Sequence, residues 1–198
     1  MASGEDTRSR ILDAAIEMMD SGGEASIRVA TIAAKLDIAE PSIYHHFTNR
    51  AALVEAAYVE WYWRCLKPEI SMETVMALVD TQEEYVDAII KLMTWGYEKD
   101  RHASRAVRIS VLGAAQRNPQ LANAINDINR QFLGSVANSV KVAQKRKWVR
   151  SELDPVATAY WLHGQILGRV VAEMDEGSID LEHWDALSFE AVLTILQP

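Results

Sequence analysis

Cysteine and long apolar runs are scarce in this sequence. Among its 198 residues there is one cysteine, Cys65, so no internal disulfide can form and a reducing cytoplasm is the expected compartment. No run of about 18 apolar residues occurs, which argues against a membrane-spanning helix. The first ten residues are polar and contain no signal-peptide core. We therefore expect a cytoplasmic protein that does not associate with membranes.

Basic residues are also in the minority. The chain has 20 Lys and Arg against 28 Asp and Glu, which gives a formal net charge of -8. This balance argues against nucleic acid as a partner, because phosphate contacts need Lys and Arg. The argument is weak, however, since binding needs only a local patch and net charge mainly governs solubility and steering.

Proline and glycine are few, at 5 and 9, and fall mostly at the ends of segments with helical periodicity. β-Branched residues never alternate with polar ones for long enough to indicate a sheet. Asn118 before Pro119 and Asp154 before Pro155 are cap and first-turn pairs that predict helix starts. The sequence therefore predicts an all-α protein of about nine helices.

Two short helices near the N-terminus are joined by a turn of about three residues. They are predicted over residues 27–36 and 40–47, and we expect Ser26 to cap the first of them. This geometry is that of a helix-turn-helix. At about 100° per residue, Ile43 and Phe47 share the buried side of the second helix.

The outer face of the helix at 40–47 carries groups that hydrogen-bond and stack yet bear little charge. These residues are Pro41, Ser42, Tyr44, His45 and His46. His45 points almost directly away from the core, while Tyr44 and His46 flank the boundary. Such side chains suit base edges, thymine methyls and phosphate oxygens in a major groove. The alternative is a pair of surface histidines beside a core tyrosine.

The adjacent histidines do not form a metal site. Neighbours on a helix diverge by about 100°, whereas paired ligands lie at i, i+3 or i+4. The other histidines have no Cys or Glu at ligand spacing, and no nucleophile elbow or Gly-rich phosphate loop is present. The sequence therefore predicts no metal, no cofactor and no enzymatic activity.

Two stretches together resemble a known family. "ILDAAIEMM" and "SIRVATIAAKLDIAEPSIYHHFTNRAAL" are similar to the N-terminal DNA-binding domain of TetR/AcrR transcriptional regulators, over about residues 7–55. The resemblance implies a helix-turn-helix domain at 1–50 and a C-terminal ligand-binding and dimerisation domain at 51–198. It also implies a homodimer that binds operator DNA without ligand and usually represses.

The resemblance assigns roles by position. It implies that Ser42, Tyr44, His45 and His46 contact the operator from the recognition helix. Arg50, which opens the fourth helix, matches the residue that reaches a phosphate. With Arg28 as a nearby basic residue and Pro41 on the outer face, the expected DNA-contacting set is Arg28, Pro41, Ser42, Tyr44, His45, His46 and Arg50.

The sequence also departs from the family's pattern. Ala30 stands where Arg is frequent, Asp37 where Gly is frequent, and Ala39 where Ser or Thr usually caps the recognition helix. Glu40 adds a negative charge close to where a phosphate would lie, although it also favours the helix N-terminus. We therefore expect few phosphate contacts and modest affinity for DNA.

Aromatic residues and a methionine recur in the C-terminal part and predict a pocket for an apolar or planar small molecule. The candidates are Trp61, Trp63, Met93, Trp95, Tyr97, Tyr160, Trp161 and His163. For each of them, packing in an ordinary helical core is the alternative. The sequence does not identify the effector.

The last two helices, predicted at 155–176 and about 181–196, are apolar on more than one face. Gly164 and Gly168 permit close approach of another helix. These helices are expected to form half of a four-helix homodimer interface, with packing inside one chain as the alternative.

Two hypotheses of function follow. In the first, the protein is a ligand-responsive repressor released from its operator by a small apolar or aromatic molecule. In the second, it is a helical small-molecule-binding protein whose specific DNA binding is weak or lost, as Ala30, Ala39 and Glu40 suggest.

Overall fold

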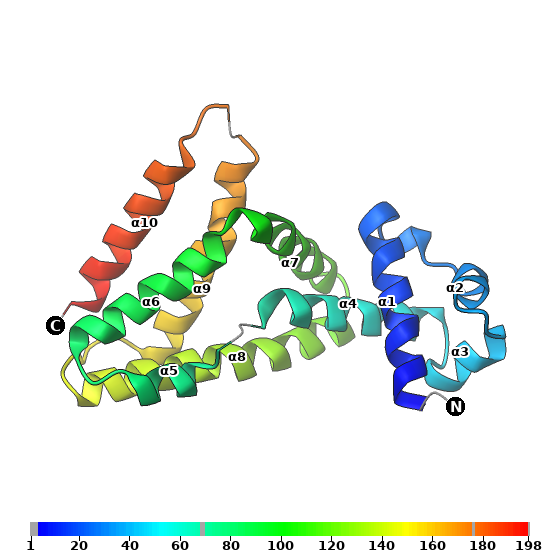
Figure 1. Ribbon diagram of the computed structural model, residues 1–198, viewed down its shortest axis with the longest axis horizontal. Coiled ribbons are helices and arrows are strands. Elements are labelled where there is room, and N and C mark those ends of the chain that lie inside the picture. The colour runs from blue at the N-terminus through cyan, green and yellow to red at the C-terminus, as the bar shows by residue number, and fades with distance from the viewer. Residues whose placement is uncertain (1–3, 68–69, 176, 198) are drawn as a thin grey trace. The chain divides into compact units, whose positions relative to one another are not determined.

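A computed structural model describes residues 4–67, 70–175 and 177–197, and over these the chain is helical without strands (Figure 1). The α-helices are α1 Gly4–Gly22, α2 Val29–Leu36, α3 Glu40–His46, α4 Arg50–Leu66, α5 Met72–Leu78, α6 Gln82–Tyr97, α7 His102–Ala115, α8 Pro119–Lys145, α9 Pro155–Glu173 and α10 Leu181–Leu196. Two 3₁₀ turns, η1 Glu24–Ser26 and η2 Lys99–Arg101, complete them. The all-α prediction is confirmed, with ten α-helices in the described residues against about nine expected.

One helix, α5, was missed by sequence analysis. It is only seven residues long and depends on a local cap, in which the side chain of Ser71 accepts a hydrogen bond from the backbone N–H of Thr74. So short a helix carries too few apolar repeats to reveal its period. At the other end of the chain, α9 stops at Glu173, and position 176, where this helix was predicted to end, lies outside the described residues.

The predicted helix starts were mostly correct. The side chain of Asn118 accepts hydrogen bonds from the N–H groups of Gln120 and Leu121, and Asp154 accepts one from Ala157. Ser26, by contrast, does not cap α2. Its hydroxyl lies in η1 and donates to the carbonyl of Met18 at 2.6 Å, because the chain makes an extra turn before α2 begins.

The chain divides into two compact units. The first ends at Arg64 and also takes in Ala114–Ile125, and the second comprises Cys65–Gly113 and the chain from Asn126 onward. The functional boundary at residue 50 stays a prediction.

In the first unit, α1, α2 and α3 pack on one another. Ile11, Ile32, Ile43 and Leu53 are at most 1% exposed and form its centre. Burying each of these side chains stabilises the fold by about 1.5–3 kcal/mol.

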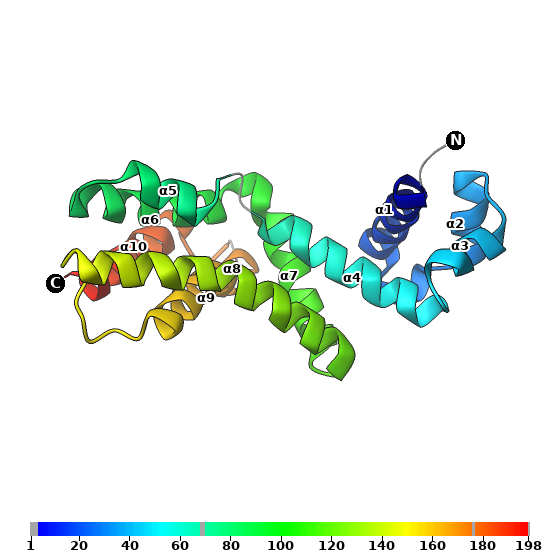
Figure 2. The same cartoon turned by 90° about the horizontal axis from the view of Figure 1, so that it is seen from below.

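The second unit has its core among α6, α8, α9 and α10, which lie together in both views (Figure 1, Figure 2). From α6, Tyr85, Ile89 and Met93 are buried, and they meet Val136 and Val140 of α8. The helix α10 packs on both α6 and α9. Among the described helices, none is long and apolar enough to cross a lipid bilayer.

Candidate nucleic-acid interface and ligand cavity

The recognition helix candidate, α3, is held by two buried anchors. Ile43 is 1% exposed and Phe47 is 4% exposed, as the helical angles predicted. Tyr44 and His45 are exposed, and His46 is half-buried. The centroids of the two imidazole rings lie 5.4 Å apart with a 74° angle between the ring planes, which is an edge-on contact. Pro41 is also exposed and Ser42 is half-buried at the start of the same helix.

The turn before α3 is tight despite the absence of glycine. Asp37 has φ 53° and ψ 50°, the left-handed conformation for which glycine is usually selected. Aspartate is among the few other residues that adopt it readily. The N–H of Ile38 then donates to the carbonyl of Ala33 at 3.0 Å. Asp37, which stands where glycine is frequent in similar proteins, therefore preserves the turn.

The N-terminus of α3 has no side-chain cap. Ala39 occupies the cap position in an extended conformation, and Glu40 and Pro41 begin the helix. Glu40 therefore supplies negative charge near the free N–H groups, where it complements the helix dipole. The same carboxylate opposes the approach of a phosphate to this end of the helix.

Arg50 forms hydrogen bonds within its own domain. Its Nε donates to the carbonyl of Ile27 at 2.9 Å, and one Nη donates to the carbonyl of Glu24 at 2.7 Å. Arg28, the N-cap residue of α2, and Tyr44 line the same shallow hollow as Arg50. The structure thus brings together three of the expected DNA-contacting residues, Arg28, Tyr44 and Arg50. It also gives Arg50 a structural role that the sequence did not predict.

A small cavity lies inside the second unit, between α6, α7, α8 and α9. Its volume is about 30 Å³, enough for water-sized molecules but far below the several hundred cubic ångströms of a typical ligand site. Its lining is Leu66, Ile89, Leu92, Met93, Trp95, Gly96, Arg108, Phe132, Leu133, Val136, Ala159, Leu162, His163 and Ile166. Three residues of the expected ligand-binding set, Met93, Trp95 and His163, are therefore brought together.

The other five candidates lie elsewhere. Tyr97 is buried, and its hydroxyl is 2.6 Å from that of Ser188 on α10. Trp161 packs at the edge of the core, while Tyr160 is 45% exposed. Trp61 and Trp63 are half-buried on α4 and are not among the described residues that line the cavity. Helical spacing alone could not separate these positions.

Arg108 and His163 are the polar pair of the cavity. One Nη of Arg108 lies 3.2 Å from Nδ1 and 3.0 Å from Nε2 of His163, and the two residues are 4% and 8% exposed. Burial, followed by the nearby charge of Arg108, lowers the pKa of His163 to about 3. The imidazole is therefore neutral at physiological pH.

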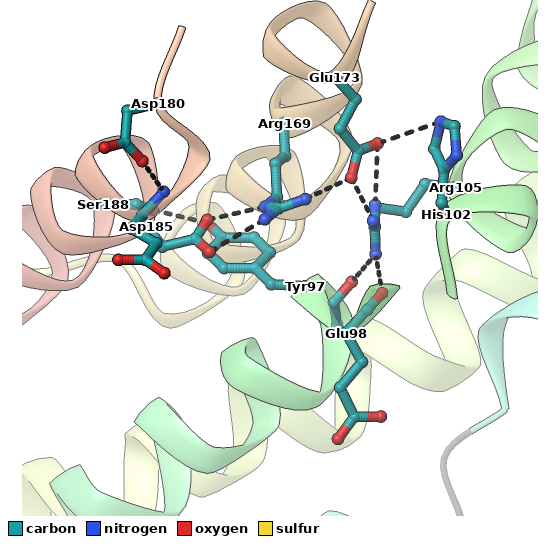
Figure 3. A network of polar contacts seen from close by, with 11 residues as sticks. Tyr97, Glu98, His102, Arg105, Arg169, Glu173, Asp180, Asp185 and Ser188 are labelled. Atoms are coloured by element: carbon teal, nitrogen blue, oxygen red, sulfur yellow. Dashed lines mark hydrogen bonds and ion pairs between the residues drawn. The ribbon is translucent and has the colours of Figure 1, made fainter. Parts of the chain in front are cut away.

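A second polar cluster, shown in Figure 3, surrounds the buried carboxylate of Glu173 on α9. Arg105 of α7 and Arg169 of α9 both donate to it. Arg105 also donates to the carbonyls of Gly96 at 2.6 Å and Glu98 at 3.1 Å. These contacts tie the C-terminal end of α6 and the helix α7 to α9.

The cluster continues to α10. Arg169 forms a two-point contact with Asp185, with Nε–Oδ1 and Nη2–Oδ2 distances of 2.7 and 3.0 Å. The sequence analysis missed this cluster. Its signal was present as charged residues repeated on apolar helices, at i and i+4 for Arg169 and Glu173.

No group of three or more His, Cys, Asp or Glu suited to a metal ion occurs within the described part of the chain. Residues 11–57 match the family model of bacterial regulatory proteins, tetR family. The chain carries the DNA-binding domain of the TetR family. The resemblance inferred over residues 7–55 is thereby confirmed.

Relatives of TetR type are similar to almost the whole chain. The HTH-type transcriptional regulator UidR of Escherichia coli K12 is 24% identical over 187 residues, covering 94% of this chain and 91% of UidR. The names of the family and of this relative are those of transcriptional regulators and not of enzymes, in agreement with the sequence analysis.

Solved structures share the fold. Salmonella enterica GusR has a TM-score of 0.69 at 22% identity, covering 99% of this chain and 98% of its own. FadR from Bacillus subtilis, in complex with stearoyl-CoA, has a TM-score of 0.66 at 20% identity, with coverages of 96% and 99%. A regulator from Saccharomonospora viridis in complex with choline has a TM-score of 0.70 at 17% identity, with coverages of 98% and 100%.

Removing the charge of Glu173 is expected to destabilise the protein strongly. The Glu173→Gln substitution keeps the shape but leaves two buried arginines without their shared carboxylate, which typically costs about 3–5 kcal/mol. Denaturant unfolding at fixed protein concentration measures the loss. Asp87→Asn, which removes one partner of the exposed pair Lys91–Asp87, is the control and should cost less than about 1 kcal/mol. Equal losses in the two variants would contradict a structural role for the cluster.

The depressed pKa of His163 predicts a loss of stability in acid. Between its unfolded value of about 6.5 and its folded value of about 3, only the unfolded chain binds the proton, so stability falls as pH falls. From pH 7 to pH 5 the wild type should lose up to about 2 kcal/mol more than His163→Gln. Denaturant unfolding at both pH values tests this. The exposed-residue control, His183→Gln, should follow the wild type, and identical pH dependence of all three proteins would contradict the assignment.

Proposed function

We propose that the protein is a repressor that binds operator DNA as a homodimer and is released by a small molecule bound in its second unit. The observation that supports it most is the outer face of α3. In a TetR-type domain this helix rests on Ile43 and Phe47 and exposes Tyr44 and His45, side chains that suit base edges.

The recognition helices of the dimer would enter successive major grooves, roughly 34–36 Å apart. We assign base contacts to His45 and Tyr44 at the outermost positions of α3. We assign phosphate contacts to His46, half-buried at the end of α3, and to Arg28, the N-cap residue of α2. The full proposed set is Arg28, Pro41, Ser42, Tyr44, His45, His46 and Arg50.

Positive charge near this face is limited. We therefore expect the affinity for DNA to depend only weakly on salt concentration. Lys35 is paired with Glu17, and the guanidinium of Arg50 donates hydrogen bonds to the carbonyls of Ile27 and Glu24. Few cations therefore remain to release counterions from phosphate, and the salt slope should correspond to at most about five contacts per subunit.

We assign the dimer interface to α9 and α10, which carry five of the eleven large exposed apolar side chains among the described residues. On α9 these are Val156, Tyr160 and Val171, and on α10 they are Leu187 and Leu193; Met174, also exposed, caps the C-terminal end of α9. Val171 is 72% exposed and Met174 is 84% exposed. Exposing such large apolar side chains to water is unfavourable, so a partner surface is expected to cover them. The α9 residues follow helical spacing and make one stripe, as a helical dimer interface requires.

The response to ligand would begin at the cavity. A cavity of about 30 Å³ must enlarge to admit an organic molecule, so the helices that line it must move. Among them, α7 carries Arg108, and its end at Ala114–Ala115 belongs to the unit that holds the TetR domain. A coupling of about 1–3 kcal/mol between the two sites would give a response of roughly 5–150-fold.

The alternative function is ligand binding without specific DNA recognition. Three features of the first unit favour it: the uncapped α3, the carboxylate of Glu40, and the pairing of Lys35 with Glu17. Affinity for a specific site compared with scrambled DNA of equal length, at one salt concentration, separates the two functions.

Substitutions on α3 should have two different effects on DNA binding. His45→Ala should reduce discrimination between operator and mutated operator by about 1–3 kcal/mol, whereas His46→Ala should weaken both complexes alike. Fluorescence anisotropy with DNA flanking the protein's own gene provides the measurement, and Lys91→Ala, an exposed change in the second unit, is the control. Arg50→Ala should weaken binding to all sequences and also lower the stability of the domain. Indistinguishable effects of the two histidine substitutions would refute the assignment of His45 to base contacts and of His46 to phosphate contacts.

Charges placed on the exposed stripe should dissociate the dimer. Val171→Glu and Leu187→Glu each bury a carboxylate in the proposed interface and should weaken association at least about tenfold. Sedimentation velocity over a concentration series measures it. Leu78→Glu is the matched control, because Leu78 on α5 is 74% exposed but lies outside the stripe. A dimer that survives both interface substitutions and yields to the control would place the interface elsewhere.

A further inference from the structure

One arginine joins the end of α4 to the wall of the cavity. We propose that Arg101 is the positioning residue of the ligand response: it holds the last turn of α4 against Trp95, so that a molecule which enlarges the cavity also displaces α4. This inference rests on the proposed response to a small molecule and names the residue through which the cavity acts on α4.

Arg101 lies in η2 and makes two contacts with its guanidinium. Its Nη2 donates to the carbonyl of Cys65 at 2.8 Å. Its guanidinium carbon lies 3.5 Å from the centroid of the Trp95 ring, which is a cation–π contact. Burial lowers the pKa of Arg101, which indicates that the cation is partly removed from water. Both contacts gain strength from this removal, because charges interact more strongly where the dielectric constant is low.

The carbonyl that Arg101 binds belongs to the last turn of α4, which ends at Leu66. The last four carbonyls of a helix have no partner within it, and they form the negative end of the helix dipole. A cation that accepts this position therefore holds the helix by its end. From there α4 continues without interruption back to Arg50, which lies within the residues that match the TetR model.

The contacts of Arg101 connect two parts of the cavity wall. Trp95 of α6 lines the cavity, and so does Leu66, the residue that follows Cys65 on α4. A ligand that enlarges the cavity must either separate Trp95 from the end of α4 or move the two together. Arg101 favours the second outcome, because one guanidinium holds both the Trp95 ring and the carbonyl of Cys65.

The other end of α4 is fastened within the first unit. The guanidinium of Arg50 donates to the carbonyls of Ile27 and Glu24, and Arg64 pairs with Asp13 of α1 at 2.7 Å. Glu24 belongs to η1, the turn that precedes α2 and the helix-turn-helix. A displacement of α4 is therefore passed on to the segment that leads into the proposed DNA-contacting helices.

Arg146 has the same two kinds of contact away from the cavity. Its Nη1 donates to the carbonyl of Val79 at 2.9 Å, and its guanidinium carbon lies 4.6 Å from the centroid of the Trp148 ring. Neither Val79 nor Trp148 is among the described residues that line the cavity, and neither belongs to α4. Arg146→Gln is therefore the matched control for Arg101→Gln.

The test uses a side chain in place of a ligand. Ala159 of α9 is 1% exposed and lines the cavity, so Ala159→Leu forces a larger apolar group into about 30 Å³ and must move the wall. In the wild-type background it should lower affinity for operator DNA at least about fivefold, the lower end of typical allosteric couplings. In the Arg101→Gln background the same substitution should lower it less than about twofold. Fluorescence anisotropy with DNA flanking the protein's own gene measures the affinities.

Two further backgrounds separate positioning from general stability. Arg146→Gln should leave the full effect of Ala159→Leu in place, and Arg101→Lys, which keeps the charge but not the planar fork, should retain part of it. An equal effect in the wild-type and Arg101→Gln backgrounds would overturn the inference, because the packing of Leu66 alone would then move α4. Loss of the effect in Arg146→Gln as well would also overturn it, since lower stability would then be the cause. Ala159→Val, a smaller change, replaces Ala159→Leu where that variant does not fold.

Hydrogen exchange of the free protein, followed by mass spectrometry, tests the same contact without DNA. Ala159→Leu should speed the exchange of backbone N–H groups in the last turn of α4, and should add nothing in Arg101→Gln, where that turn is already released. A protein with this pattern that does not distinguish operator from scrambled DNA would keep the inference and lose the repressor proposal. A protein that binds its operator specifically, with exchange in α4 unaffected by Ala159→Leu, would do the reverse.

Discussion

The buried carboxylate of Glu173 is the centre of the contacts that hold the helices of the second unit together. A carboxylate that is 2% exposed is stable as an anion only when cations surround it, and here Arg105 and Arg169 do so from two helices. Arg105 in turn satisfies the last carbonyls of α6, and Arg169 reaches Asp185 on α10. Hydrophobic packing alone tolerates sliding between helices, whereas this network fixes α6, α7, α9 and α10 at one point.

The same helix, α7, is anchored through Arg105 and lines the cavity of the second unit. The cavity beside Arg108 is too small to accept a ligand without rearrangement. In the proposed switch, ligand binding would therefore require movement of the helices that line the cavity.

The sequence predicted features that depend on local periodicity and caps. The helical fold, the anchors Ile43 and Phe47, and the start of α8 followed from spacing within a few residues, and the TetR resemblance was confirmed. The cavity could be predicted only in part, because eight aromatic, methionine and histidine candidates share helical spacing and tertiary packing selects among them. The pairing of Arg105 with Glu173, separated by 68 residues, leaves no local pattern.

The central claim is that a small molecule bound in the second unit lowers the affinity of the protein for operator DNA. The most direct measurement is the anisotropy of labelled operator bound to the proposed dimer, titrated with an apolar or aromatic probe that binds the free protein. The account predicts a decrease in operator affinity of roughly 5–150-fold at saturation. Operator affinity that stays constant while the probe saturates the wild-type protein would contradict it.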